Sequence, residues 1–223
     1  MENIKDKRKI IIENIKTIQK NSNFSSLPDP KLIAVSKQQE EYKIEIAIKS
    51  GQKFFGENRV QEAQQRWQKR IEIYKDIELR LIGPLQTNKV KQALNLFDII
   101  ETIDREKLAK EISKNLNSLT KTKSFYIQVN TGSEAQKSGL IPSEVDAFIE
   151  YCSIDLKLPI IGLMCIPPQY EEPSMHFALL KKIADKNKLI ELSMGMSNDY
   201  EEAIKFGATS VRIGSLFFGA RKT

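Results

Sequence analysis

The residues best suited to chemistry in this sequence stand directly after short apolar runs, where the carboxyl ends of strands are expected. Lys37 follows the run LIAVS (residues 32–36). A lysine at such a place often only extends its ammonium group into water or begins the next helix. If the amine is desolvated instead, its pKa falls and it can attack an aldehyde. Lys37 is therefore a candidate nucleophile, and a surface role is the alternative.

The segment TSVRIGS (209–215) carries an arginine in the middle of a period-two pattern. Alternation sends Arg212 to the face opposite its apolar neighbours, which is the inner face if the strand belongs to a barrel. An inward arginine needs a partner, and this is either a carboxylate on a neighbouring strand or a bound ligand. Gly214 lets the backbone approach a ligand closely, and Ser215 offers an N–H group and a hydroxyl.

Ser197 lies in the segment LSMGMSNDYEEAIKFGA (192–208), just before a predicted helix. A serine there is a good helix N-cap, and helix N-termini also bind anions. Loops after the seventh and eighth strands form the recurrent phosphate site of barrels, so Ser197 with Gly214 and Ser215 favours a phosphorylated ligand. The acidic first turn expected for this helix disfavours an anion deep along it. We therefore expect the phosphate on backbone amides near Ser197 and Ser215.

The second apolar run ends in the segment FFGENRVQEA (54–63). Asn58 in this segment either begins the following helix or presents its amide to a ligand. The segments 81–89 and 128–140 are long, polar and contain glycine, which ordinary strand–helix turns do not require. They predict extended loops at the same end of the fold.

Histidine and cysteine are too few for several common kinds of site. His176 is the single histidine, so its count excludes a catalytic histidine pair and a His-rich metal site. Cys152 and Cys165 lack metal-ligand spacing, and two thiols in 223 residues do not make a disulfide scaffold. We therefore expect no metal, and a reducing cytoplasm fits the thiols.

The elements that would position these residues alternate between strand-length apolar runs and stretches of helical periodicity. Isoleucines at positions 4, 11, 15 and 18 predict an amphipathic opening helix. The apolar runs span residues 32–36, 53–56, 79–83, 96–100, 125–129, 159–166, 189–194 and 209–213. Eight strand–helix units predict an α/β fold of the (β/α)8 TIM-barrel type, and an open doubly wound sheet is the main alternative. We expect one domain over residues 1–223, with a helix and turn at 1–30 and the barrel at 31–223.

Composition and charge narrow the class of protein further. Hydrophobic residues make up 40% of the chain, which predicts a globular fold rather than a disordered or collagenous one. No uninterrupted apolar run approaches the roughly 20 residues that span a bilayer, so we expect no membrane insertion and no secretion. The net charge of +6 suggests an acidic partner such as nucleic acid. Because the lysines are scattered among polar residues, solvated helix faces explain them better.

Six segments, in order along the chain, resemble those of the pyridoxal phosphate homeostasis protein family. They are AVSK (34–37), FGENRVQE (55–62), IGPLQTNK (82–89), VNTGSEAQKSGL (129–140), GLMCIP (162–167) and LSMGMSNDYEEAIKFGATSVRIGSLFFGAR (192–221). The resemblance runs from about Lys31 to Arg221. Proteins of this family are similar to the N-terminal barrel of bacterial alanine racemase and have no second domain.

The resemblance implies a site for pyridoxal 5′-phosphate (PLP). Lys37 would hold the cofactor as a Schiff base, Arg212 would face the pyridine nitrogen, and Asn58 would line the ring pocket. Three residues would hold the phosphate group: Ser197, Gly214 and Ser215. The family is known as a carrier or regulator of PLP and of amino-acid pools without an established turnover reaction. We therefore expect PLP and PLP-requiring apo-enzymes as partners, with no nucleic acid, no membrane and no catalytic residue.

One departure and two rival functions remain. Most relatives have an aromatic–His–Phe segment before the IG of the third strand, whereas this chain has Leu79, Arg80 and Leu81, so no role that rests on that histidine is carried over to this chain. An arginine at the ring nitrogen only donates and stays charged, which weakens the cofactor as an electron sink. The first rival is nevertheless a small amino-acid racemase or lyase with Lys37 as base, and the second is a basic nucleic-acid-binding protein.

Overall fold

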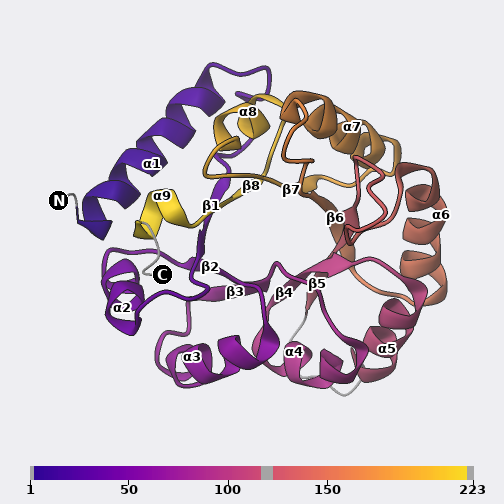
Figure 1. The fold of residues 1–223 in the computed structure, drawn as a ribbon, viewed down its shortest axis with the longest axis horizontal. Coiled ribbons are helices and arrows are strands. Elements are labelled where there is room, and N and C mark those ends of the chain that lie inside the picture. The colour runs from indigo at the N-terminus through magenta and orange to yellow at the C-terminus, as the bar shows by residue number, and fades with distance from the viewer. Residues whose placement is uncertain (1–2, 117–122, 220–223) are drawn as a thin grey trace.

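The computed structural model describes residues 3–116 and 123–219, so the last two residues of the matched segments, 220 and 221, lie outside the described part. Eight parallel strands close into a barrel in which each strand pairs with the next (Figure 1). The last strand pairs with the first, from Lys31 opposite Ser210 to Ala34 opposite Ile213. The predicted (β/α)8 fold is confirmed, and this closing pair rules out the open sheet.

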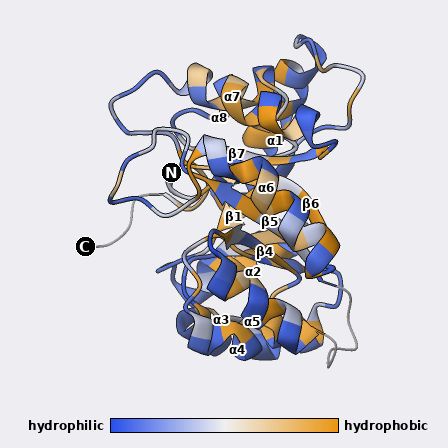
Figure 2. Ribbon diagram, turned by 90° about the vertical axis from the view of Figure 1, so that its right-hand side faces the viewer, coloured by the Kyte–Doolittle hydropathy of each residue, from blue (hydrophilic) through white to orange (hydrophobic). Residues whose placement is uncertain are grey.

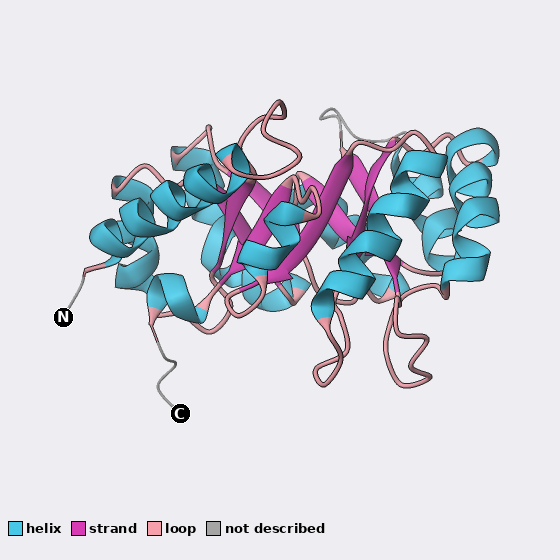
Figure 3. Cartoon of the chain, turned by 90° about the horizontal axis from the view of Figure 1, so that it is seen from above, coloured by secondary structure: helices cyan, strands magenta, loops and turns pink. Residues whose placement is uncertain are grey.

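The strands and helices alternate along the chain. The strands are β1 (Lys31–Val35), β2 (Phe54–Glu57), β3 (Glu78–Leu81), β4 (Ile99–Ile103), β5 (Ser124–Val129), β6 (Ile160–Cys165), β7 (Glu191–Met196) and β8 (Ser210–Ile213). The α-helices are α1 (Ile4–Lys20), α2 (Glu41–Lys49), α3 (Val60–Ile73), α4 (Val90–Leu96), α5 (Glu106–Leu116), α6 (Val145–Glu150), α7 (Pro173–Lys186), α8 (Tyr200–Lys205) and α9 (Ser215–Phe218). Figure 3 shows the strands crossing the middle of the molecule with helices on both sides.

The fourth predicted strand, residues 96–100, was placed too early. Leu96 ends α4, Phe97 follows in the turn, and the strand begins only at Ile99. Leu96 and Phe97 are apolar because both are buried where the helix meets the core. Burial of this kind does not distinguish a helix end from a strand. The strand therefore includes Glu101, whose side chain is buried.

The opening helix α1 lies outside the barrel beside α8 and α9 (Figure 1). Its buried face includes Ile4, Ile11 and Ile15, so the amphipathic helix predicted from isoleucine spacing is confirmed. Burying one such side chain contributes roughly 1.5–3 kcal/mol. Because α9 has only four residues, α1 covers the outer position that a full helix after β8 would occupy.

The apolar core lies mainly between the strands and the surrounding helices. The rings of Phe55 on β2 and Trp67 on α3 lie 4.7 Å apart and are fully buried. Figure 2 shows both hydrophilic and hydrophobic segments on the helices, as expected of elements with one buried face. None of the described helices is both long and apolar enough to span a bilayer.

Large side chains of the strands pack inside the barrel. Tyr126 and Met164 pack there with Ile99, so Met164 serves packing. Arg80 is also fully buried, and its guanidinium lies 5.9 Å from the Tyr126 ring centre. Arg80 is therefore a structural residue of the barrel interior.

Candidate functional site

A cavity of about 720 Å³ opens at the carboxyl ends of the strands. Its lining comes from segments that are far apart in the sequence, at the ends of β1, β2, β3, β5, β6, β7 and β8. All the residues singled out from the sequence as ligand-binding candidates line it: Lys37, Asn58, Ser197, Arg212, Gly214 and Ser215. The barrel thus brings together in one place the strand ends that the sequence predicts to be reactive.

Lys37 is half-buried in the turn that follows β1 and extends into this cavity lining. The turn is fixed from behind, because the hydroxyl of Ser36 donates to Glu57 Oε1 at 2.6 Å. The same carboxylate oxygen accepts from Arg66 and from Trp67 Nε1, each at 2.9 Å. This anchorage of the preceding residue holds the lysine backbone firmly at the mouth. Helix α2 begins only at residue 41, so the lysine does not start it.

Arg212 on β8 is almost wholly buried, with 3% of its surface exposed. Its Nη1 donates to the Ser193 hydroxyl and its Nη2 to the backbone carbonyl of Cys165, each at 2.8 Å. Both acceptors are neutral, and Arg212 forms no ion pair with a carboxylate within the described residues. Of the two alternatives drawn from the sequence, the carboxylate partner is therefore wrong. The guanidinium charge remains available to whatever occupies the cavity, which Arg212 also lines.

Ser197 and Ser215 face each other across the cavity lining, and the Ser215 hydroxyl donates to Ser197 Oγ at 3.3 Å. The prediction that Ser197 caps a helix is wrong, because Asp199 holds the N-cap position of α8. Asp199 instead accepts a hydrogen bond from the backbone N–H of Met196 at 2.6 Å. The Ser197 hydroxyl is thus not committed to a helix terminus. Two adjacent hydroxyls of this kind are suited to an anion.

Gly214 lines the cavity next to this hydroxyl pair. A methyl group added at Gly214 would lie 3.5 Å from Val35 Cβ, which is an ordinary contact. Protein packing alone therefore does not require glycine here, and the space left by its missing side chain opens on the cavity. A ligand that approaches the backbone closely would require it.

Asn58 follows β2 directly and is half-buried at the mouth. It does not begin the next helix, since Arg59 is the N-cap of α3. The loop after β3 lies directly against its backbone, because a Cβ at Gly83 would clash with the Asn58 carbonyl oxygen. Only glycine permits this approach, and it fixes Asn58 in the cavity lining.

Further titratable residues of the lining were not foreseen: Lys137, Glu171 and Asp199. Lys137 lies in the long loop after β5 and pairs with Glu134 at 2.5 Å. Glu171 lies 3.2 Å from His176 Nε2. The predicted length of the loop at 128–140 pointed to this region, but length alone does not tell which loop residue turns inward.

The thiols and the histidine take no direct part in this lining. Burial raises the pKa of Cys165 and of Cys152 to about 12, so both thiols stay protonated near neutral pH. His176 is buried on α7. No group of three potential metal ligands occurs within residues 3–116 and 123–219.

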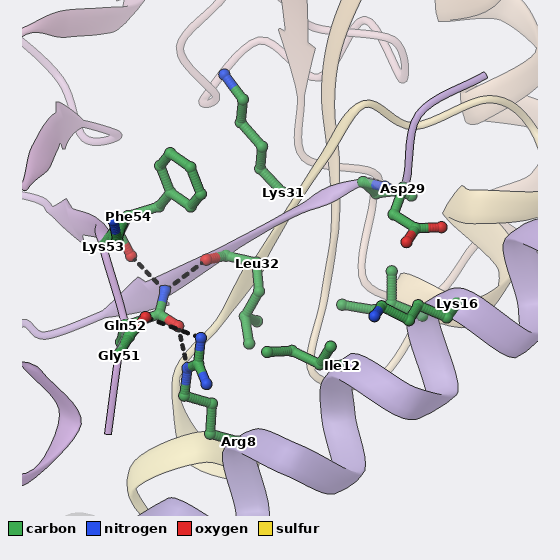
Figure 4. Close-up of a pocket in the computed structure, with 12 residues that line it drawn as sticks. Arg8, Ile12, Lys16, Asp29, Lys31, Leu32, Gly51, Gln52, Lys53 and Phe54 are labelled. Carbon is green, nitrogen blue, oxygen red and sulfur yellow. Dashed lines mark hydrogen bonds between the residues drawn. The ribbon is translucent and has the colours of Figure 1, made fainter. Parts of the chain in front are cut away.

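A second cavity, of about 330 Å³, lies at the opposite ends of β1 and β2, beneath α1 (Figure 4). Arg8 of α1 points toward Gln52, donating from Nε to its side-chain oxygen at 3.2 Å and from Nη2 to the Gly51 carbonyl at 2.8 Å. The amide of Gln52 in turn donates to the Leu32 carbonyl at 2.7 Å. These bonds join α1 to the strands, so this end of the barrel has a visible structural role.

The donor set of the mouth fits a small ligand with an aldehyde, an aromatic nitrogen and an anionic group. It offers the amine of Lys37, the buried guanidinium of Arg212 and the hydroxyl pair. A primary amine can condense with an aldehyde, and hydroxyl and guanidinium groups donate to acceptors. PLP has all three features, so the residues present fit this cofactor.

Comparisons with known proteins agree with this fit. Residues 8–222 match the family described as alanine racemase, N-terminal domain. The pyridoxal phosphate homeostasis protein of Aquifex aeolicus is 40% identical over 206 residues, which cover 86% of this chain and 87% of the relative. The structure of PipY from Synechococcus elongatus with PLP bound is 32% identical, with a TM-score of 0.78, and the match covers 94% of this chain and 100% of that one.

Similarity to alanine racemase itself concerns the fold alone. The enzyme from Clostridium difficile is 14% identical, with a TM-score of 0.68, and the match covers 95% of this chain but 56% of the enzyme. The Aquifex aeolicus homeostasis protein and PipY, in contrast, match along most of both chains. Barrel, mouth and sequence together place this chain in the pyridoxal phosphate homeostasis protein family, which shares its barrel with the alanine racemase N-terminal domain.

Proposed function

We propose that this protein binds PLP in the mouth cavity and serves in the supply and balance of this cofactor in the cell. The observation that carries the proposal is the convergence of an amine, a guanidinium and two hydroxyls on one cavity from separate strand ends. Lys37 is the covalent anchor. Its nitrogen lone pair adds to the aldehyde carbon, and loss of the aldehyde oxygen as water leaves a C=N bond.

The other residues orient the cofactor. Ser197 and Ser215 bind the phosphate with their hydroxyls and backbone N–H groups, close to Gly214. Asn58 lines the ring. Arg212 donates to the ring nitrogen and, being always charged, keeps it unprotonated. A bound PLP supplies an electron sink, and an unprotonated nitrogen makes that sink weak.

The titratable groups of the lining favour a carrier over a racemase or lyase. A two-base reaction needs a further acid or base across the cavity from Lys37. The described candidates are engaged elsewhere: Lys137 pairs with Glu134, Glu171 contacts His176, and Asp199 accepts from a backbone N–H. We therefore propose that the protein holds and releases PLP without a dedicated turnover reaction.

The remaining parts of the proposal follow from this role. A carrier of PLP would deliver it to apo-enzymes that require the cofactor, and it would act in the cytoplasm, where two unpaired thiols stay reduced. One domain, made of the barrel and its opening helix, suffices for binding. Neither nucleic acid nor a membrane has a part in it.

The test of this function is cofactor delivery in the presence of a phosphatase that destroys free PLP. The PLP-loaded protein is mixed with an apo-enzyme, and the recovered activity of that enzyme is followed. The proposal expects faster or fuller recovery than with the same total amount of free PLP. The absorbance of the mixture should show PLP bound to this protein at the start. Equal recovery with and without the protein would contradict carriage, and no absorbance change on adding PLP would contradict binding.

A further inference from the structure

A chain of buried polar side chains crosses the barrel interior from β3 to the mouth. Arg80 on β3 donates from Nη1 to Glu101 Oε1 on β4 at 2.9 Å. The other carboxylate oxygen of Glu101 accepts from the Ser193 hydroxyl on β7 at 2.6 Å. Ser193 in turn accepts from Arg212 on β8 at 2.8 Å. The side chains of Arg80 and Glu101 are 0% exposed, and Ser193 is fully buried as well.

The direction of every hydrogen bond in this chain is fixed by chemistry. A carboxylate only accepts and a guanidinium only donates. The Ser193 hydroxyl must therefore give its proton to Glu101 and turn its lone pairs to Arg212. The second nitrogen of Arg212 is held by the Cys165 carbonyl. Glu101 thus decides, through one hydroxyl, how the guanidinium at the cavity floor is oriented.

Arg80 is the cation partner of Glu101 inside the barrel. A buried carboxylate without such a partner is costly. Burial alone would lower the pKa of Arg80, but the negative charges of Glu101 and Glu78 raise it above its ordinary value. Arg80 also donates from Nε to Glu78 at 2.7 Å. Arg80 therefore keeps Glu101 in place as an acceptor for Ser193.

We propose that Glu101 is a positioning residue that acts through Ser193 to fix the Arg212 guanidinium against the ring of bound PLP. The proposal rests on the proposed function, because it concerns the same site. Arg212 needs no direct carboxylate partner, because the Ser193 hydroxyl that it contacts is itself hydrogen-bonded to Glu101. The guanidinium is held in place while its remaining N–H groups stay directed to the cavity.

The test compares two serines that face the same buried cluster. Ser193→Ala removes the link to Arg212 and leaves every charge in place. Ser210→Ala is the matched control, because Ser210 pairs in register with Ser193, is fully buried, and contacts Arg80 at 3.4 Å. Glu101→Gln is a second variant, which is compared with the others if it folds. Thermal melts and circular dichroism establish that the variants are folded.

Two measurements follow on each folded variant. The first is PLP affinity with the absorption band of the bound cofactor, and the second is the NMR spectrum of arginine side chains in the protein without PLP. Ser193→Ala should weaken PLP binding about tenfold, as expected for a lost hydrogen bond to a charged group, and should shift the band. The signals of a restrained Arg212 guanidinium, assigned with Arg212→Lys, should disappear. Ser210→Ala should match the wild type in all three respects, and a folded Glu101→Gln should behave as Ser193→Ala does.

Other outcomes overturn the proposal. Wild-type affinity, band and arginine signals in Ser193→Ala would show that Arg212 needs no such support. Equal changes in Ser193→Ala and Ser210→Ala would show an effect of packing rather than of position. If the wild type binds no PLP, the proposed function fails, while the arginine signals without PLP still decide whether Ser193 restrains Arg212.

Discussion

The two cavities at opposite ends of the barrel are both lined by cations, yet the buried arginine of the mouth and two lysines of the opposite end differ in what they contact. At the mouth, Arg212 is held by a hydroxyl and a carbonyl, so no carboxylate neutralises it directly. At the opposite end, Lys53 lies 3.0 Å from Asp76, and Lys31 lies 3.9 Å from Glu78. A cluster of positive charge is therefore not by itself a binding site. A site for an anion needs cations whose charge remains uncompensated.

The cavities differ also in their neutral donors. The hydroxyls of Ser197 and Ser215 meet at the mouth. No serine or threonine is among the described residues that line the cavity at the opposite end, beneath α1, which we call the lower cavity. Arg8 there is used to hold α1 against the strands. Burial lowers the pKa of Arg8 from its ordinary value. The mouth can bind a ligand, and the lower cavity mainly joins a helix to the barrel.

The largest effect is expected from replacing Lys37, whose amine is the proposed covalent anchor. Lys37→Ala should abolish the mass that borohydride fixes on the protein after incubation with PLP, because no nitrogen remains at that position to form the C=N bond. The matched control is Lys53→Ala in the lower cavity, which should retain the full adduct. Intact-protein mass spectrometry measures both. An undiminished adduct in Lys37→Ala would place the covalent site elsewhere.

The second prediction concerns reactivity at the mouth. With PLP bound, the α-proton of alanine or serine should exchange with deuterated water more slowly than about one per second, the low end of usual enzyme turnover. NMR of the amino acid measures this rate. Slow exchange that vanishes in Lys37→Ala fits a carrier with residual reactivity. Exchange at an enzyme-like rate would instead favour the hypothesis that the protein is a racemase.

The third prediction compares the two hydroxyls of the phosphate site, those of Ser197 and Ser215. Ser197→Ala removes one donor to the phosphate, worth roughly 1.5–3 kcal/mol, so PLP affinity should fall by about one to two decades. Ser215→Ala should cost less, because Ser215 is more exposed and keeps its backbone N–H. Absorbance titration gives both affinities. Wild-type affinity in Ser197→Ala would remove this residue from the phosphate site.

The smallest effect is expected from a substitution in the lower cavity. Arg8→Ala removes two hydrogen bonds from a half-exposed side chain and should lower the free energy of unfolding by about 1 kcal/mol. PLP affinity should stay unchanged. Urea denaturation measures the first quantity, and Lys5→Ala on the exposed face of α1 is the control. A large loss of PLP affinity in Arg8→Ala would mean that the two ends are not separate in function.

Much of the mouth could be found from the sequence because parallel strands end at one edge of a barrel. That rule needs only the approximate end of each strand, and it led to Lys37 and Asn58 despite boundary errors. It failed for Glu101, since the fourth apolar run was placed three residues early and left this carboxylate beyond the strand. Partners across the barrel, such as Ser193, depend on register between distant strands. The backbone carbonyl of Cys165, which holds Arg212, has no sequence signal at all.

The central claim is that the mouth cavity binds PLP and the lower cavity does not. Its most direct test is the position of the covalent adduct in the wild-type protein. The protein is incubated with one equivalent of PLP, reduced with borohydride and digested, and the modified peptides are mapped by mass spectrometry. The account predicts the label on the peptide that contains Lys37. A label found mainly on Lys16, Lys31 or Lys53, which line the lower cavity, would contradict it.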